Sequence, residues 1–271
     1  MCNALKFPRS TYYKALISEP SNKQMEYEKF SRQVIDKFNE YKQRYGAVKL
    51  QRALTSEGIE CSVKRVQRHM VRNGLHSVVV KKYKHHSSKN EIPEKENILN
   101  RNFKTTTINQ KWCTDITYIY VLKEGWTYLA SVMDLHTRKI IGYAYGTEIT
   151  AELAKRAVKN ACLNVQDTKG IILHSDLGTQ YTSRLFENYI DKKNMIHSFS
   201  RKGNPYDNAC IESFHSVLKK EEIYRHTYKD FNEASLAIFE YIESWYNRIR
   251  IHGSIDYMTP QQKEDEALCA A

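Results

Sequence analysis

The sequence lacks the features that mark membrane, secreted and zinc-stapled proteins. No apolar run approaches the roughly 18 residues of a membrane-spanning helix, and residues 1–20 hold no continuous apolar stretch like that of a signal peptide. The six cysteines are widely scattered, and none lies two to four residues from another, the spacing that clamps zinc. These absences predict a soluble, cytoplasmic chain with reduced cysteines.

What the sequence does have is enough apolar material for a core and an uneven distribution of charge. Its 271 residues are 41% hydrophobic, which excludes disorder along the whole chain and allows one or two domains. Of the formal net charge of +11, residues 1–104 carry 22 Lys and Arg against 10 Asp and Glu, whereas the remaining residues carry 20 against 21. This asymmetry indicates a polyanion-binding part joined to a part with another task, although a solvated basic surface would give the same count.

The basic part reads as a helical region over residues 1–75. Apolar residues recur at helical spacing between Met25 and Arg44, and a second periodic stretch starts at Ala47 and stops at Gly58. A third helix is expected after the N-cap Ser62. Its cations recur at four-residue steps: Lys64, Arg68 and Arg72. Residues of about 46–74 therefore predict a helix-turn-helix that binds DNA through these cations, with a helical hairpin of the scaffold as the alternative. Residues 76–104 read as a basic linker.

The second part, residues 105–265, predicts an α/β (α+β) domain. Segments 112–121, 126–133 and 139–145 are rich in β-branched and aromatic residues and form a predicted antiparallel meander. A helix capped by Thr150, a strand over 171–174, a helix over about 182–193, a strand over 195–200 and a further helix follow. Three strands and then alternating units predict a mixed five-stranded sheet with helices on its faces, as in the ribonuclease-H-like fold.

Three acidic residues stand out by their positions on this scaffold. Asp115 lies in the middle of the first strand, Asp176 directly follows the fourth, and Glu212 lies on the helix after a turn-forming run. In a ribonuclease-H-like sheet the first and fourth strands are neighbours, and two or three carboxylates suit Mg²⁺. Taken singly, each residue could be structural, as is expected of the turn acids Asp134, Asp167 and Asp207.

The motifs around these acids carry a resemblance to a known family. The segments are WCTDIT (112–117), HSDLGTQY (174–181) and GNPYDNACIESF (203–214), with 35 residues between Asp176 and Glu212 and Lys219 seven residues further on. Together they resemble the DDE catalytic core of retroviral integrases, and more closely the OrfB-type transposases of the IS3 group of bacterial insertion sequences. Residues 245–248, His252 and residues 259–260 also match the tail of that family.

The resemblance implies a metal triad of Asp115, Asp176 and Glu212 that holds Mg²⁺ or Mn²⁺, with two ions in the site. It implies metal-dependent cleavage that frees a 3′-hydroxyl, followed by strand transfer of that hydroxyl to another phosphodiester. Helical spacing places Lys219 and His215 beside Glu212, where they would meet DNA phosphates.

The same resemblance implies double-stranded DNA partners, namely the element ends and the target, and a homo-oligomer on DNA. It also implies an upstream-frame partner or a frameshift fusion, and a bacterial, nucleoid-associated location when DNA is bound. A non-catalytic DNA-binding regulator of transposition and a nuclease for RNA–DNA hybrids remain the alternatives. For His174, two residues before Asp176, a structural role is favoured over one beside the metal.

Overall fold

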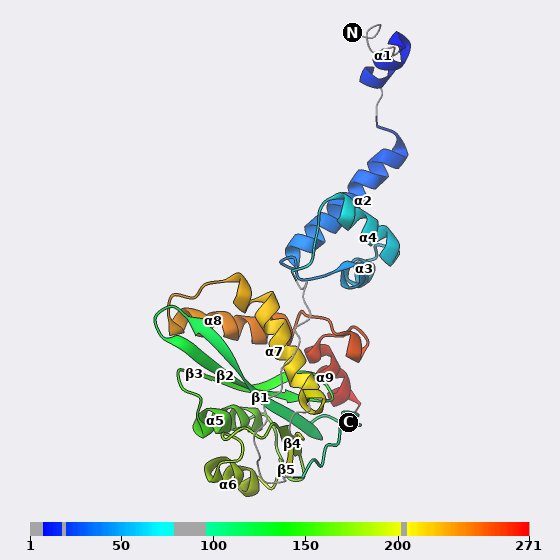
Figure 1. Cartoon of the computed structure of the whole chain (residues 1–271). Helices are drawn as coiled ribbons and strands as arrows, with labels where there is room; N and C mark the ends of the chain where they lie inside the picture. The colour runs from blue at the N-terminus through cyan, green and yellow to red at the C-terminus, as the bar shows by residue number, and fades with distance from the viewer. Residues whose placement is uncertain (1–7, 18–19, 79–95, 202–204, 271) are drawn as a thin grey trace. The chain divides into compact units, whose positions relative to one another are not determined.

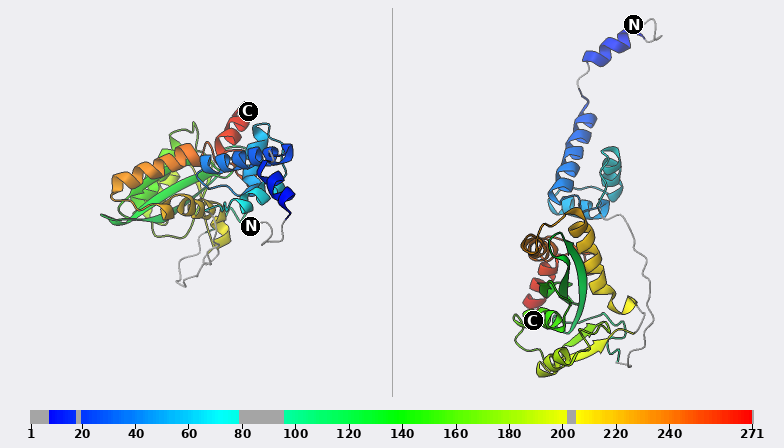
Figure 2. Two further views of the ribbon diagram at one scale, coloured as in Figure 1. Left: turned by 90° about the horizontal axis from the view of Figure 1, so that it is seen from above. Right: turned by 60° about the vertical axis from the view of Figure 1, so that its left-hand side comes forward.

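The computed structural model describes residues 8–17, 20–78, 96–201 and 205–270, which belong to two compact units divided after Val78 (Figure 1). In the first unit, α1 (Arg9–Ile17) precedes a bundle of α2 (Asn22–Glu40), α3 (Ala47–Ser56) and α4 (Val63–Arg72). These three helices pack against one another (Figure 2). Their apolar faces form the core of the unit with Phe30, Val34, Phe38, Leu50, Leu54, Val66 and Met70.

The ends of α3 and α4 follow the predicted signals. The side chain of Ser62 accepts a hydrogen bond from the Arg65 N–H at 3.2 Å, which satisfies a backbone donor in the first turn of α4. Gly58 follows α3 with a φ of 82°, a left-handed conformation that glycine adopts without strain. The second and third predicted helices are therefore confirmed.

A five-stranded mixed sheet organises the second unit. Its strands are β1 (Lys111–Val121), β2 (Gly125–Asp134), β3 (Ile140–Gly146), β4 (Ile172–Ser175) and β5 (Ile196–Phe199), in the order β3-β2-β1-β4-β5. The first three pair antiparallel, whereas β4 pairs parallel to both β1 and β5. The predicted fold is confirmed, including the neighbouring positions of the first and fourth strands.

Helices cover both faces of this sheet (Figure 1). On one face, α5 (Ala151–Cys162) and α6 (Arg184–Lys192) bury the main core with Trp112 and Leu173. A Cβ atom on Gly142 of β3 would overlap the backbone of Ala157 and Ala161, so glycine lets α5 lie close on the sheet. On the other face, α7 (Ala209–Glu221) contacts β1 and β2.

The remaining elements precede or follow α7 along the chain. A short 3₁₀ turn (Pro205–Asn208) leads into α7, and α8 (Phe231–Glu240) continues into a π-helical turn (Tyr241–Tyr246), with α9 (Pro260–Cys269) after it. The end of the segment predicted as a linker, residues 96–104, belongs to this unit. Leu99 is buried there, and its N–H donates to the Ser198 Oγ at 2.9 Å. Across the described residues, every helix is too short or too polar to cross a bilayer.

Candidate functional site

Asp115 and Asp176 lie where β1 and β4 stop pairing. The last pair of the β1–β4 ladder is Cys113 with His174. Asp115 lies two residues after Cys113, within β1, and Asp176 lies two residues after His174, directly after the end of β4. Asp176 is exposed as a residue, and its Oδ1 accepts the Gly178 N–H at 2.9 Å. Partial desolvation of its carboxyl and the nearby Asp115 carboxylate raise the pKa of Asp176 to about 6. The two carboxylates therefore lie within electrostatic reach of each other and repel each other.

Helix α7 brings two further predicted residues to Asp115. His215 is 5% exposed, and its Nδ1 lies 3.2 Å from the Asp115 Oδ2. We expected His215 to meet a DNA phosphate, but its position on the face of α7 that packs on the sheet makes Asp115 its partner. Burial lowers the pKa of Lys219, and Asp115 acts in the opposite direction, which places the Lys219 ammonium within electrostatic reach of this carboxylate.

Glu212, the third predicted metal ligand, lies in the first turn of α7 and is partly buried. Within the described ranges, no three His, Cys, Asp or Glu side chains approach closely enough to hold a metal ion. The structure thus joins Asp115 to Asp176 electrostatically and to His215 by a hydrogen bond, while Glu212 stands on the adjoining helix.

A buried acid, Asp207, fixes the start of α7 to the sheet, although in the sequence it is one of several turn acids. Asp207 is fully buried and binds Arg101 at 2.6 Å and Arg201 at 3.1 Å. Burial alone would raise the pKa of Asp207, but hydrogen bonds from Arg201 and Arg101 lower it to about 2. This network holds residues 97–101, the end of β5 and the entrance to α7 together.

Asn208 connects that entrance to the strand that carries Asp115. Its Nδ2 donates to the Thr114 carbonyl at 3.2 Å, beyond the last β1–β4 pair. The Oδ1 of Asn208 is buried and has no hydrogen-bond partner in the described part of the chain. The Asn208 side chain thus ties the entrance of α7 to the residue before Asp115 on β1.

His174 and Tyr181 are buried near the two aspartates. His174 lies between the Oγ atoms of Ser198 and Ser200, at 2.9 and 3.0 Å, and burial lowers its pKa to about 4. These contacts agree with the favoured structural role. Tyr181, which motif reading did not single out, is buried with its hydroxyl 3.2 Å from the Thr114 Oγ1.

In the first unit, all three predicted DNA-binding cations, Lys64, Arg68 and Arg72, are exposed on α4. Gln67 and Val71 are exposed beside them, and a search for cation spacing alone misses both. Residues at positions i, i+3, i+4 and i+7 share one helical face, so Lys64, Gln67, Arg68 and Val71 form a continuous stripe. Such a stripe is what a helix in the major groove presents.

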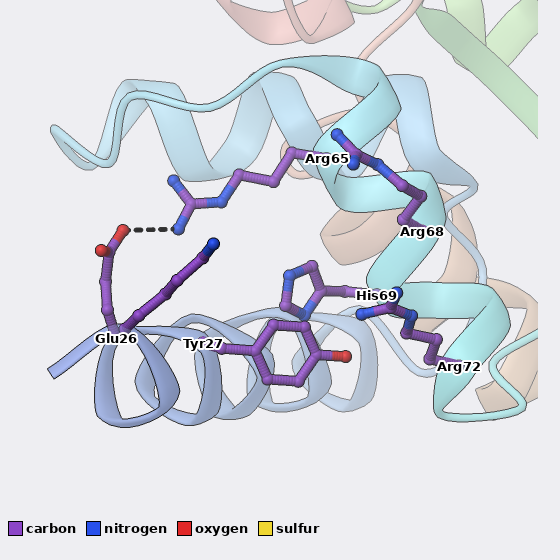
Figure 3. A pocket seen from close by; sticks show the side chains of 7 residues that line it. Glu26, Tyr27, Arg65, Arg68, His69 and Arg72 are labelled. Atoms are coloured by element: carbon purple, nitrogen blue, oxygen red, sulfur yellow. Dashed lines mark hydrogen bonds and ion pairs between the residues drawn. The ribbon is translucent and has the colours of Figure 1, made fainter. Parts of the chain in front are cut away.

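A cationic pocket of about 250 Å³ lies between α2 and α4 (Figure 3). Its lining residues are Lys23, Glu26, Tyr27, Arg65, Arg68, His69 and Arg72. Arg65 binds Glu26 at 2.9 Å, and the Arg72 guanidinium lies 5.5 Å from the centre of the Tyr27 ring. Burial and the surrounding arginines lower the pKa of His69, so the imidazole adds little positive charge to this pocket.

Family models match both units. An integrase core domain matches residues 106–205, a second integrase core model matches residues 193–260, and an HTH-like domain matches residues 26–83. These matches cover the sheet with its flanking helices and the bundle that contains α4.

Similar proteins include bacterial transposases over nearly the full chain. The transposase for insertion sequence element IS904 of Lactococcus lactis is 39% identical over 246 residues, which cover 90% of this chain and 97% of that protein. Transposase InsF for insertion sequence IS3A of Escherichia coli is 35% identical over 271 residues, covering 99% and 94%. Among solved structures, the HTLV-2 integrase catalytic core domain in complex with magnesium shares 16% identity and a TM-score of 0.46, covering 59% of this chain and 99% of that one.

Proposed function

This chain belongs to the IS3 family of insertion-sequence transposases, with an integrase core and an HTH-like domain, and from that premise we propose how its two units divide the work. The first unit would bind double-stranded DNA at the element ends through the α4 stripe. The second would cleave the DNA strand and join its 3′-hydroxyl to a target. The partners would be element ends, target DNA and further copies of this chain assembled on them.

The observation that carries the catalytic proposal is the mutual repulsion of Asp115, in the middle of β1, and Asp176, just after β4. A carboxylate whose pKa is raised to about 6 beside another carboxylate gains from a cation placed between them. We assign Asp115, Asp176 and Glu212 as the ligands of Mg²⁺ or Mn²⁺, with two ions in the site. When bound, the metal supplies Lewis-acid stabilisation of an in-line phosphoryl displacement.

The chain's own residues would orient the reacting groups. His215 holds the Asp115 carboxylate through their 3.2 Å contact and fixes its direction. Lys219 would bind a phosphate next to the scissile bond, since its ammonium is within electrostatic reach of Asp115. Asn208 and Asp207 would keep the first turn of α7, and with it Glu212, next to the strand end. Water would be the nucleophile for cleavage, and the freed 3′-hydroxyl the nucleophile for joining.

The test is strand cleavage and joining by the purified full chain, with DNA that carries the ends of its own element. Asp115→Asn, Asp176→Asn and Glu212→Gln should each reduce both reactions by about a thousandfold or more, because each removes a ligand from a shared site. DNA binding should remain. Asp167→Asn is the matched control, because Asp167 lies in an exposed turn, where its carboxylate accepts the Lys169 N–H. Normal strand transfer by any triad variant would overturn the assignment.

The second candidate function is that of a regulator of transposition, which would bind DNA through the exposed α4 cations without cutting it. Wild-type protein decides between the two. Nicking of end DNA that requires Mg²⁺ supports the transposase reaction, whereas salt-sensitive binding without nicking supports the regulator.

A further inference from the structure

Helix α7 has a second side that does not pack on the sheet, away from the side that carries Glu212 and Lys219. Buried Ile211, His215 and Leu218 seat the helix on the sheet. At 100° per residue, Glu212 and Lys219 lie on one side of this seat, and Cys210, Ser213 and Val217 lie on the other, roughly 140° around the helix. A ligand on this second side would contact the catalytic helix away from Glu212 and Lys219.

A cavity of about 300 Å³ lies along that second side, lined by Cys210, Ser213 and Val217 from α7. Three aromatic side chains, Phe103, Phe214 and Tyr246, contribute to its walls, and Arg138, Arg250 and His252 also line it. This volume is at the lower end of the range for small-molecule sites, and the mixture of apolar walls with a few polar groups is typical of them.

The two arginines of the cavity differ in their partners. The Nε of Arg250 binds the buried Glu221 carboxylate at 3.1 Å, so its charge is already compensated. Within the described residues, the side chain of Arg138 makes one hydrogen bond, from its Nη1 to the Cys210 Sγ, a weak acceptor, and no described acid pairs with it. Among the described residues, the Arg138 guanidinium therefore lines this cavity without a counter-anion.

The backbone of Arg138 also carries a cost. Arg138 follows the turn after β2 with a φ of 63°, a left-handed conformation that glycine or asparagine adopts more easily than arginine. Nothing in the turn itself requires a guanidinium, since the Asp134 carboxylate is satisfied by Thr137 and by the Asn109 N–H. The arginine is thus explained by what its side chain meets in the cavity.

We propose that this cavity binds a small anion that combines a phosphate with a flat ring, the chemistry of a nucleoside monophosphate. Arg138 would pair with the phosphate in the bidentate geometry that suits a guanidinium. Phe103, Phe214 and Tyr246 would contact the ring by stacking or edge contacts. A free nucleotide and the terminal nucleotide of a DNA strand share this chemistry.

Calorimetric titration of the full chain with dAMP, adenosine and inorganic phosphate tests the ligand class. We expect dAMP to bind at least tenfold more tightly than either part alone, because only dAMP engages both the guanidinium and the ring wall. Equal affinity for phosphate and dAMP would overturn the proposal, as would no detectable binding of dAMP. A 5′-phosphorylated dinucleotide distinguishes the source: binding tighter than that of dAMP indicates a DNA end, and weaker binding indicates a free nucleotide.

Two variants locate the binding site. Arg138→Asn removes the guanidinium while asparagine tolerates the left-handed backbone, and it should weaken dAMP binding at least tenfold. Arg248→Asn is the matched control, because Arg248 is an exposed arginine of the same unit and does not line the cavity. Val217→Trp should block binding by filling the cavity without a change of charge. Wild-type affinity in Arg138→Asn would overturn the proposal, and so would loss of dAMP binding in Asp176→Asn, since that loss would place the nucleotide at the catalytic aspartates.

Discussion

The two units of the chain treat charge in opposite ways. In the first unit, α4 presents Lys64, Arg68 and Arg72 to solvent, where cations cost little and are available to a polyanion. In the second unit, Asp207 and Glu221 are buried and compensated: Asp207 by two arginines, Glu221 by Arg250 and the hydroxyl and indole groups of Tyr241 and Trp245. The α4 cations are thus available to a ligand, whereas Asp207 and Glu221 are part of the packed structure of the second unit.

Asp115 and Asp176 depart from the second pattern. Their carboxylates repel each other. The pKa of Asp176 is raised to about 6, whereas that of Asp207 is lowered to about 2. The pKa values of two aspartates of one unit are therefore shifted in opposite directions: that of Asp176 by desolvation and the neighbouring Asp115 carboxylate, and that of Asp207 by arginines. The direction of the pKa shift therefore distinguishes an acid that stabilises the fold from an acid that is available to bind a ligand.

Among the substitutions that test this difference, Asp207→Asn is expected to change the free energy of unfolding most. It leaves Arg101 and Arg201 without their carboxylate, but both arginines are about half exposed and can turn to water. We expect the free energy of unfolding of the second unit to fall by about 2 kcal/mol. Urea unfolding followed by tryptophan fluorescence measures this directly, because all three tryptophans, Trp112, Trp126 and Trp245, lie in that unit.

Acid unfolding provides the pH dependence of the same network. Because the folded-state pKa of Asp207 is below its unfolded value of 3.8, its contribution is complete above about pH 4 and is lost as the pH falls towards 2. Asp207→Asn should lose this dependence. Asp191→Asn, an exposed change on α6, is the control and should unfold as the wild type does. An unchanged urea midpoint in Asp207→Asn would show that the network of Asp207 with Arg101 and Arg201 does not stabilise the fold.

A smaller effect is expected where the α4 stripe meets DNA. The double variant Lys64→Gln/Arg68→Gln should weaken binding to end DNA by about tenfold, and the slope of log K against log salt should flatten by about two. The matched control is Lys29→Gln/Arg32→Gln, which removes two exposed cations from α2. Fluorescence anisotropy at several salt concentrations measures both quantities. Equal losses in the two double variants would show that bulk charge, rather than the stripe, binds DNA.

The features that depend on local sequence could be predicted, and those that depend on distant contacts could not. Helical periodicity and the Ser62 cap gave α3 and α4, and β-branched runs gave the strands, because these signals lie within one element. Helical spacing likewise put His215 on one side of α7. That this side packs on the sheet at Asp115 depends on a contact between residues 100 positions apart, which spacing does not encode.

The same limit applies to the residues that frame the site. Asp207 reads as an ordinary turn acid until the fold brings Arg101, which lies 106 positions away, to 2.6 Å from it. Arg138 reads as a turn cation until α7 places Cys210 beside it. The triad itself was predicted from the resemblance of long motifs to a family, since no single acid could be distinguished from Asp134 or Asp167 by its local sequence.

The smallest predicted effect has the opposite sign to that of Asp207→Asn. Because the folded-state pKa of Asp176 is raised above 3.8 to about 6, the folded state binds more protons than the unfolded state between these values. The free energy of unfolding of the second unit should therefore fall as the pH rises through that window. Asp176→Asn keeps an acceptor for the Gly178 N–H and removes the repulsion with Asp115, so it should be more stable than the wild type at pH 7, by about 1 kcal/mol after allowance for solvent screening.

Urea unfolding of Asp176→Asn at pH 4.5 and pH 7, without divalent cations, measures this gain. It should be small at the lower pH, where the wild-type carboxyl is largely protonated, and complete at the higher. Mg²⁺ should stabilise the wild type more than the variant, because it offsets the repulsion that the substitution has already removed. A variant that is more stable yet inactive would show that the Asp115–Asp176 pair lowers stability and is required for function. A variant less stable than the wild type at pH 7 would show instead that Asp176, like Asp207, stabilises the fold.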